Sequence, residues 1–206
     1  AELTCETDFV AKNADFVAVG DKIAETALDK GYTDVQQELS DMILDLATRV
    51  RENMGLRRLT AVQAAGDEYT AHYVHSDKKT GVVVVLKSDK AAAFADKALQ
   101  DFAYDCCLHA AAFTPLYVRK EDVDQAYINE QLDVFRAQVA ELDKPANVKE
   151  GIVKGKLNKH LAEICFLEQP FVKDDKVSVA AKMKEVGKQL GANISLSKLV
   201  LWQLGQ

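Results

Sequence analysis

The chain lacks any apolar stretch approaching the roughly 20 residues that a membrane-spanning helix needs. Its longest apolar run, Val82–Leu86, is typical of a buried β-strand. The 206 residues are 48% hydrophobic and 28% charged, a composition that can bury one large core or two modest ones. We therefore expect a soluble globular protein that has no membrane partner.

The chain also lacks the features of proteins that bind nucleic acids or nucleotides. Its formal net charge is −6, whereas affinity for nucleic acid depends on Lys and Arg groups that displace counterions. Its ten glycines form neither G-x-x-x-x-G-K-[ST] nor G-x-G-x-x-G, the patterns that hold nucleotide phosphates. We expect no direct nucleic-acid partner and no cofactor, so any role in nucleotide chemistry must concern a nucleotide on another protein.

Cysteine and histidine are scarce as well. The four cysteines, at positions 5, 106, 107 and 165, show no C-x-x-C and no spacing of a secreted disulfide framework, so we expect a reducing, cytoplasmic setting. Cys106 and Cys107 are adjacent in an apolar stretch, which favours small buried side chains over a redox pair. His72 and His75 are expected on opposite faces of a strand and cannot share a metal. We expect neither an enzyme nor a metal site.

Helical periodicity dominates the first 55 residues. Asn13 is expected to cap a helix that runs to Lys30 and stops at Gly31. One face of this helix carries Phe16, Gly20, Ile23 and Ala27. A capping box at residues 33–36 predicts a second helix, which Gly55 ends. Its apolar stripe comprises Val35, Leu39, Met42, Leu46 and Val50.

From residue 56 the pattern is typical of strands. The segments "GLRRLTAVQ", "EYTAHYV" and "TGVVVVLK" are rich in β-branched and aromatic residues, with turn signals at 65–67 and 76–77. We expect these three strands to form an antiparallel meander. A long helix is then expected at residues 91–112. Its apolar stripe comprises Phe94, Ala98, Phe102 and Cys106.

Residues 121–165 predict two helices that pack on each other. A first set of apolar residues is spaced four, three, four and three apart, as in a coiled-coil seam. These residues are Ile128, Leu132, Phe135, Val139 and Leu142. "DKPAN" then interrupts the helix, and Asn147 with Glu150 forms a second capping box for a returning helix. We expect a protruding helical hairpin, and such an arm commonly contacts a partner.

Two short segments near the ends of the chain are similar. "ETDFVAK" begins at residue 6 and "EQPFVKD" at residue 168, and each precedes an amphipathic helix and then a strand. Thr7 and Asp8 of the first segment correspond to Gln169 and Pro170 of the second. Only the first copy therefore places an acid beside its phenylalanine.

This faint repeat predicts an α+β protein of two similar subdomains. Each subdomain is expected to contain a small antiparallel sheet with packed helices. We place the first at residues 1–88 and the second at 89–206, with the coiled-coil hairpin, at about 121–165, inserted in the second.

Five segments, in their order and at their separations, resemble the core of bacterial elongation factor Ts. They are "CETDFVAKN", "NMGLRR", "YVHSDKKTGVVVVL", "HAAAFTPLYV" and "GKLNKHLAEICFLEQPFV". The resemblance covers Leu3–Gln206 and implies a guanine-nucleotide exchange factor that releases GDP from elongation factor Tu during translation elongation. The family core has two similar α+β subdomains and a coiled-coil arm. Family members also carry a small N-terminal domain and often a C-terminal helix, so the resemblance implies a truncated core here.

The resemblance also implies a partner-binding motif. Thr7, Asp8, Phe9 and Val10 match the T-D-F-V motif of the family, whose aspartate and phenylalanine intrude near the magnesium ion of the partner. That ion bridges the nucleotide and its protein and cancels repelling charge, so displacing its ligands weakens the hold on the nucleotide. A phenylalanine wedged into the partner supplies burial and forces a shift.

Further partner contacts are implied for four other residues. Thr80, Gly81 and Val82 match the family at the turn into the third strand, although the family usually has a bulkier aliphatic residue at position 80. His109 matches a family histidine near the third domain of the partner. From the residues alone, His109 is equally a histidine at a helix end, where the helix C-terminus favours its charged form.

Two other functions fit the same residues. In the first, the chain is a non-catalytic interaction module, in which the hairpin forms a homodimer and T-D-F-V merely caps a helix. In the second, Cys106 and Cys107 are the thiols of an enzyme, and Cys106→Ser would abolish its activity. An assay of GDP release distinguishes these two functions from an exchange factor, because only an exchange factor should accelerate release of GDP from the partner.

Overall fold

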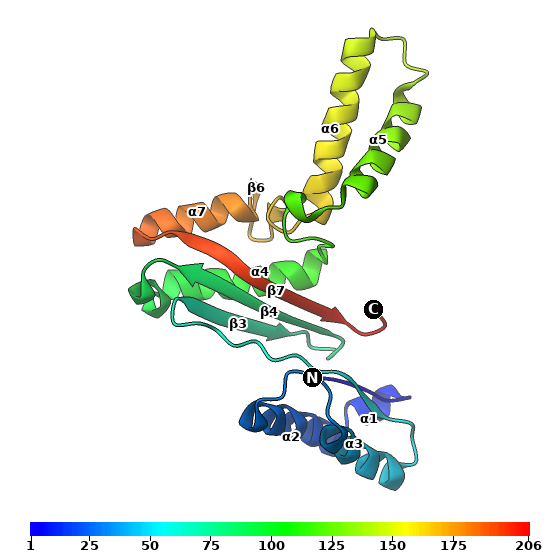
Figure 1. Cartoon of the computed structure of the whole chain (residues 1–206), viewed down its shortest axis with the longest axis vertical. Helices are drawn as coiled ribbons and strands as arrows, with labels where there is room; N and C mark the ends of the chain where they lie inside the picture. Colours follow the sequence, from blue (N-terminus) through cyan, green and yellow to red (C-terminus); the bar gives the residue numbers. More distant parts are fainter. The chain divides into compact units, whose positions relative to one another are not determined.

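A computed structural model describes all 206 residues and divides them into two compact units, Ala1–Gln63 and Ala64–Gln206. Both units combine helices with small antiparallel sheets, so the α+β class is confirmed (Figure 1). None of the helices has the length and apolar character needed to cross a bilayer. The two units are described in turn.

The first unit packs three helices with a two-stranded sheet. Its elements are β1 (Glu2–Thr4), α1 (Asp8–Ala11), α2 (Ala14–Lys30), α3 (Gln37–Val50) and β2 (Gly55–Arg58). β1 and β2 pair antiparallel, and Glu2 forms ion pairs with Arg57 and Arg58. The expected helix after Asn13 is confirmed, because the Asn13 side chain caps α2 and Gly31 ends it in the left-handed conformation.

The predicted start and end of the next helix are wrong. The Gln36 side chain bonds to Asp34 instead of completing a capping box, and α3 begins at Gln37. The helix ends at Arg51, in the left-handed conformation, and Gly55 already belongs to β2. Its buried stripe comprises Leu39, Ile43 and Leu46, whereas Val35 and Val50 are exposed.

The second unit is built on a three-stranded sheet in the order β3-β4-β7. The strands are β3 (Glu68–Val74), β4 (Thr80–Ser88) and β7 (Ile194–Gln203). Outside the arm, the α-helices of this unit are α4 (Lys97–Phe113) and α7 (Val179–Leu190), and both pack onto the core side of this sheet (Figure 1). Two short strands, β5 (Pro170–Phe171) and β6 (Asp174–Ser178), and two 3₁₀ turns complete the unit; the turns are η1 (Ala91–Ala95) and η2 (Lys120–Asp122).

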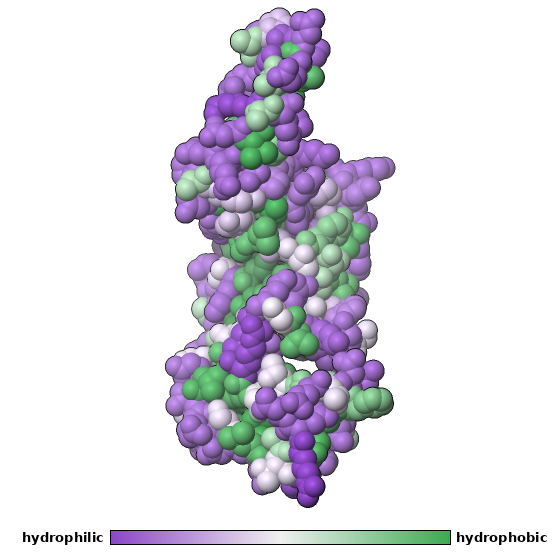
Figure 2. Space-filling view, turned by 90° about the vertical axis from the view of Figure 1, so that its right-hand side faces the viewer, coloured by the Kyte–Doolittle hydropathy of each residue, from purple (hydrophilic) through white to green (hydrophobic).

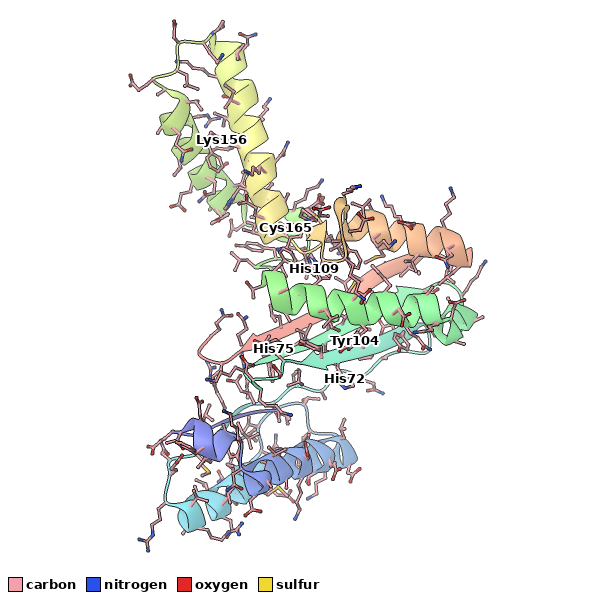
Figure 3. All side chains as sticks on the ribbon, turned by 180° about the vertical axis from the view of Figure 1, so that it is seen from behind. His72, His75, Tyr104, His109, Lys156 and Cys165 are labelled. Atoms are coloured by element: carbon pink, nitrogen blue, oxygen red, sulfur yellow. The ribbon has the colours of Figure 1, made fainter.

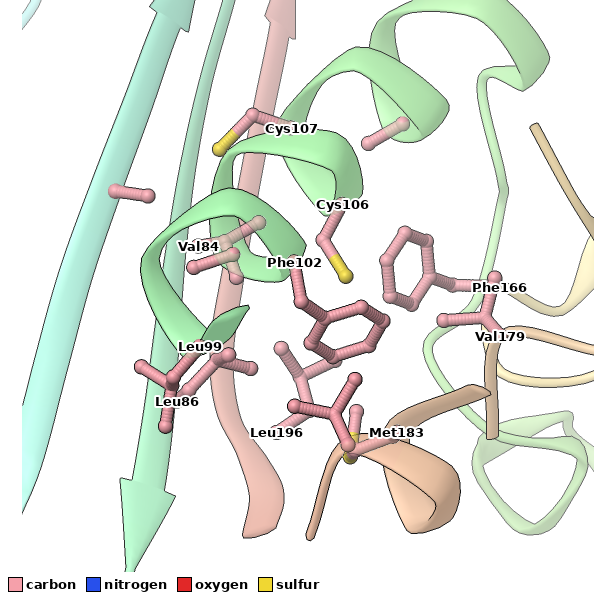
Figure 4. Close-up of a cluster of buried hydrophobic side chains, with 14 of the residues drawn as sticks. Val84, Leu86, Leu99, Phe102, Cys106, Cys107, Phe166, Val179, Met183 and Leu196 are labelled. Carbon is pink, nitrogen blue, oxygen red and sulfur yellow. The ribbon is translucent and has the colours of Figure 1, made fainter. Parts of the chain in front are cut away.

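The core of this unit is formed by buried residues of the sheet, α4, α7 and the segment after α6 (Figure 4). They include Val84, Leu86, Leu99, Phe102, Phe166, Met183 and Leu196. Cys106 and Cys107 lie among them, and burial raises the pKa of Cys107 to about 12. Both cysteines therefore pack as small buried side chains, as expected. The helix expected from residue 91 is interrupted at Asp96, whose side chain caps α4.

The expected meander is wrong in one of its three strands. β2, from "GLRRLTAVQ", pairs with β1 in the first unit, and β7 takes the third place in the sheet. The boundary between the units accordingly falls after Gln63, because β3 and β4 share a sheet with β7, whereas our expected boundary follows residue 88. The similarity of two subdomains stays a prediction.

The expected helical hairpin is confirmed (Figure 1). It consists of α5 (Gln125–Val139) and α6 (Ala146–Ile164), which pack on each other. The capping box is wrong, because α6 starts directly after Pro145 and Glu150 pairs with Arg136 instead. Val139 and Val153 are buried between the helices. The coiled-coil character of this arm stays a prediction.

Candidate functional site

Phe9 is the most exposed large hydrophobic side chain of the chain, with 90% of its surface in water. It lies on α1, a single turn of helix, where the next residue, Val10, is buried. A single exposed phenylalanine is ordinary on a protein surface. Here, however, the neighbouring contacts fix the turn that carries it.

Thr7 caps this turn at its start. Its hydroxyl oxygen accepts a hydrogen bond from the Val10 N–H at 3.3 Å, and its carbonyl oxygen accepts one from the Ala11 N–H at 3.1 Å. Val10, the residue after Phe9, packs into the core of the first unit and anchors the turn there. The cap and the anchor together keep Phe9 on the outward side.

Glu52 holds the same threonine from outside the turn. One carboxylate oxygen accepts a hydrogen bond from the Thr7 hydroxyl at 2.6 Å, and the other accepts one from the Thr7 N–H at 3.2 Å. We did not single out Glu52 from the sequence, where only its place just before "NMGLRR" could have drawn attention.

The surroundings of Thr7 are negatively charged. Burial, followed by the charge of Glu52, raises the pKa of the Cys5 thiol, and Asp8 adds to this effect. The thiol donates a hydrogen bond to the Thr7 carbonyl oxygen at 3.4 Å. Asp8 is the first residue of α1 and is exposed. The motif thus presents an aromatic ring beside carboxylates.

The corresponding phenylalanine of the second copy is buried. Phe171 is 3% exposed and packs against Phe102, with ring centroids 5.8 Å apart. It lies on β5 directly after Pro170. The two similar segments therefore differ in what they do with the ring: one packs it inside and the other presents it to solvent.

A second group of expected site residues opens β4. Thr80 and Gly81 are half-buried and pair with Gln203 and Trp202 of β7, whereas Val82 is buried in the core. A methyl group added at Gly81 would meet no atom within 4 Å, so the space beside this position is open. Thr80 and Gly81 are therefore accessible, and Val82 is not.

His109 lies in the interior, near the end of α4. Its Nε2 is 2.9 Å from Oε1 of Gln169, and its Nδ1 accepts a hydrogen bond from the Val172 N–H at 3.1 Å. Nδ1 is therefore unprotonated, Nε2–H is the donor, and the ring is neutral. Burial lowers the pKa of His109, so the charged form expected at a helix end is not favoured. The partly exposed ring of Phe113 stacks on it, with centroids 4.7 Å apart.

The structure groups the expected site residues into two sets. Thr7 to Val10 lie together in the first unit. In the second unit, the end of α4 and the turn before β4 lie at the same end of the sheet, as the positions of His109 and His75 indicate (Figure 3). No group of three or more His, Cys, Asp or Glu residues is arranged to hold a metal ion.

Comparison with known proteins gives a consistent result. Residues 6–206 match the family described as Elongation factor TS. Elongation factor Ts of Treponema denticola is 69% identical over 204 residues, which cover 99% of this chain and 73% of that protein. Elongation factor Ts of Treponema pallidum is 58% identical, covering 99% of this chain and 71% of that protein. The protein of the same name from Borrelia recurrentis is 41% identical, covering 98% of this chain and 73% of that protein.

Proposed function

The chain belongs to the elongation factor Ts family of translation elongation factors, and from this membership we propose that it is a guanine-nucleotide exchange factor acting on elongation factor Tu. It promotes release of GDP from that partner in the cytoplasm and is not itself an enzyme. The observation that carries the proposal is the exposed ring of Phe9 on a turn that Thr7, Val10 and Glu52 hold in place.

In this proposal the turn enters the partner near its magnesium ion. Phe9 gains the burial that it lacks in the free chain, which is worth roughly 1.5–3 kcal/mol for a side chain of this size. The exposed Asp8 carboxylate, in surroundings that are already negative, competes with the ligands of the magnesium ion for that ion. Because Mg²⁺ neutralises the phosphates of the nucleotide, disturbing its ligands loosens the nucleotide.

Exchange requires more contact than one ring supplies. If the factor weakens nucleotide binding by some ratio, the nucleotide weakens factor binding by the same ratio. Each tenfold change needs about 1.4 kcal/mol of contacts that the nucleotide-bound partner cannot make. Accessible Thr80 and Gly81 are proposed as further direct contacts. Val82 and His109 are buried, so we propose that they hold the contact surface from behind.

A second candidate function rests on the helical arm. Its surface is largely hydrophilic with small apolar patches (Figure 2), and Val134 and Val148 are exposed on it. These residues favour a contact made by the arm, either within the complex or with a second copy of the chain. The alternative is thus a non-catalytic coiled-coil module that forms a homodimer.

The two functions are separated by one experiment. Elongation factor Tu loaded with a fluorescent GDP is mixed with the protein and excess unlabelled nucleotide, and the loss of fluorescence is followed by stopped flow. We expect release to accelerate in proportion to the concentration of the protein until it saturates. Unchanged release at micromolar excess would leave the interaction module as the better account.

A further inference from the structure

The two hydrogen bonds between Thr7 and Glu52 continue the register of the β1–β2 pair. Thr4 lies opposite Gly55 in that ladder. Thr7 follows Thr4 by three positions, and Glu52 precedes Gly55 by three. The carboxylate of Glu52 therefore binds Thr7 beyond the point where the backbone ladder ends. Thr7 is fixed relative to the paired strands and not only within its own turn.

Glu52 follows directly after a well-anchored helix, α3. Arg51, directly before it, ends α3 with a φ of 63°, a left-handed conformation that is uncommon for residues other than glycine. Leu39, Ile43 and Leu46 bury α3 in the core of the first unit. The carboxylate thus connects the exposed α1 turn to a helix that the core holds in place.

We propose that Glu52 is a positioning residue for nucleotide exchange, which acts through Thr7 to keep the α1 turn oriented so that Phe9 is presented to the partner. The inference rests on the function proposed above. A helix of four residues is too short to be stable by itself, so α1 depends on such outside restraints. Without the Glu52 carboxylate, the restraints on α1 described above are reduced to the Thr7 cap and the packing of Val10.

This role predicts which kinetic quantity changes. If only a fraction of the free molecules presents Phe9, the apparent affinity for the partner falls in proportion to that fraction. Once bound, the turn makes the same contacts as before. Loss of Glu52 should therefore raise the concentration that gives half-maximal GDP release and leave the saturated rate unchanged.

The test compares Glu52→Ala, Thr7→Val and the double variant in the GDP-release assay, over a full range of protein concentration. For Glu52→Ala we expect about a fivefold rise in the half-maximal concentration, the upper range for an exposed, charge-assisted pair. In the Thr7→Val background, Glu52→Ala should raise the half-maximal concentration clearly less, because the Thr7 hydroxyl that bonds to Glu52 is already absent. Glu38→Gln is the matched control, since this carboxylate also bonds to neighbours in the first unit, Lys30 and Tyr32, but lies on α3 away from Thr7.

A second readout is independent of the partner. Hydrogen exchange of the Thr7 and Val10 amides should be faster in Glu52→Ala than in the unaltered protein and in Glu38→Gln. Equal rises of the half-maximal concentration in both Thr7 backgrounds, or a lower saturated rate at an unchanged half-maximal concentration, would overturn the proposal. So would unchanged amide exchange.

Failure of this inference can be told from failure of the function beneath it. If Phe9→Ala slows GDP release but Glu52→Ala leaves its concentration dependence unchanged, the exchange function stands and the role of Glu52 is refuted. If the unaltered protein does not accelerate GDP release, both are refuted.

Discussion

Replacing Phe9 by alanine should separate binding to a partner from folding. In the free chain the ring is 90% exposed, so its removal should change the free energy of unfolding by no more than about 0.5 kcal/mol. In the complex the lost burial amounts to roughly 1.5–3 kcal/mol, and a ring at the centre of an interface reaches the upper part of this range. Because about 1.4 kcal/mol corresponds to a factor of ten, GDP release at a fixed subsaturating concentration should slow by about 10- to 100-fold.

The assay measures the release of fluorescent GDP from elongation factor Tu at several concentrations of each variant, with thermal unfolding recorded in parallel. Leu28→Ala is the matched control, because Leu28 is 72% exposed in the same unit and lies on α2, outside the motif. We expect both variants to unfold at temperatures close to that of the unaltered protein, and only Phe9→Ala to slow GDP release.

Two results would refute this reasoning. If Phe9→Ala lowers the free energy of unfolding strongly and slows GDP release in the same proportion, the ring supports the fold and does not act by contacting the partner. If Leu28→Ala slows release as much as Phe9→Ala, any exposed apolar group would serve, and the turn would have no special part.

Three further predictions concern the second unit and the thiols. Phe171→Ala should lower the free energy of unfolding by about 3–5 kcal/mol in denaturant titrations, because this ring is buried. The folded pKa of His109 lies below its unfolded value, so the stability that it contributes is present above about pH 6.5 and is lost as the pH falls through the folded pKa; this loss should shrink in His109→Gln. A thiol reagent should modify Cys5 first in the folded chain, and the three buried thiols only on unfolding.

Local pattern was sufficient wherever one helix face or one cap decided the structure. Asn13 and Gly31 mark the two ends of α2 in both sequence and structure, because each satisfies backbone groups within its own turn. The hairpin likewise follows from its spaced apolar residues. Both predicted capping boxes failed for a common reason: Gln36 and Glu150 find other partners, Asp34 and Arg136, that the local pattern does not reveal.

The local sequence pattern could not predict which distant segments pair as strands. β1 has three residues and no periodicity to display, so the partner of β2 could not be found, and β7 had no signal linking it to β4. The same limit applies to the site. The resemblance located Thr7 to Val10, whereas the part of Glu52 is visible only in the structure, where its carboxylate binds Thr7. His109 was similarly expected as a helix-end histidine favoured in its charged form, because nothing in the local pattern shows that Gln169 and the Val172 N–H bond to its ring.

The late arrival of β7 has a consequence for how the protein is made. Asp89, just after β4, is joined to Asn193, just before β7, by three hydrogen bonds across 104 residues of chain. During synthesis the β3–β4 hairpin therefore emerges long before the strand that covers its second edge, and an uncovered edge can pair with strands of other chains. The ribosome must deliver α4, the whole arm and α7 before that edge is closed. A factor that serves elongation thus depends, for its own folding, on how quickly elongation carries it to its last strand.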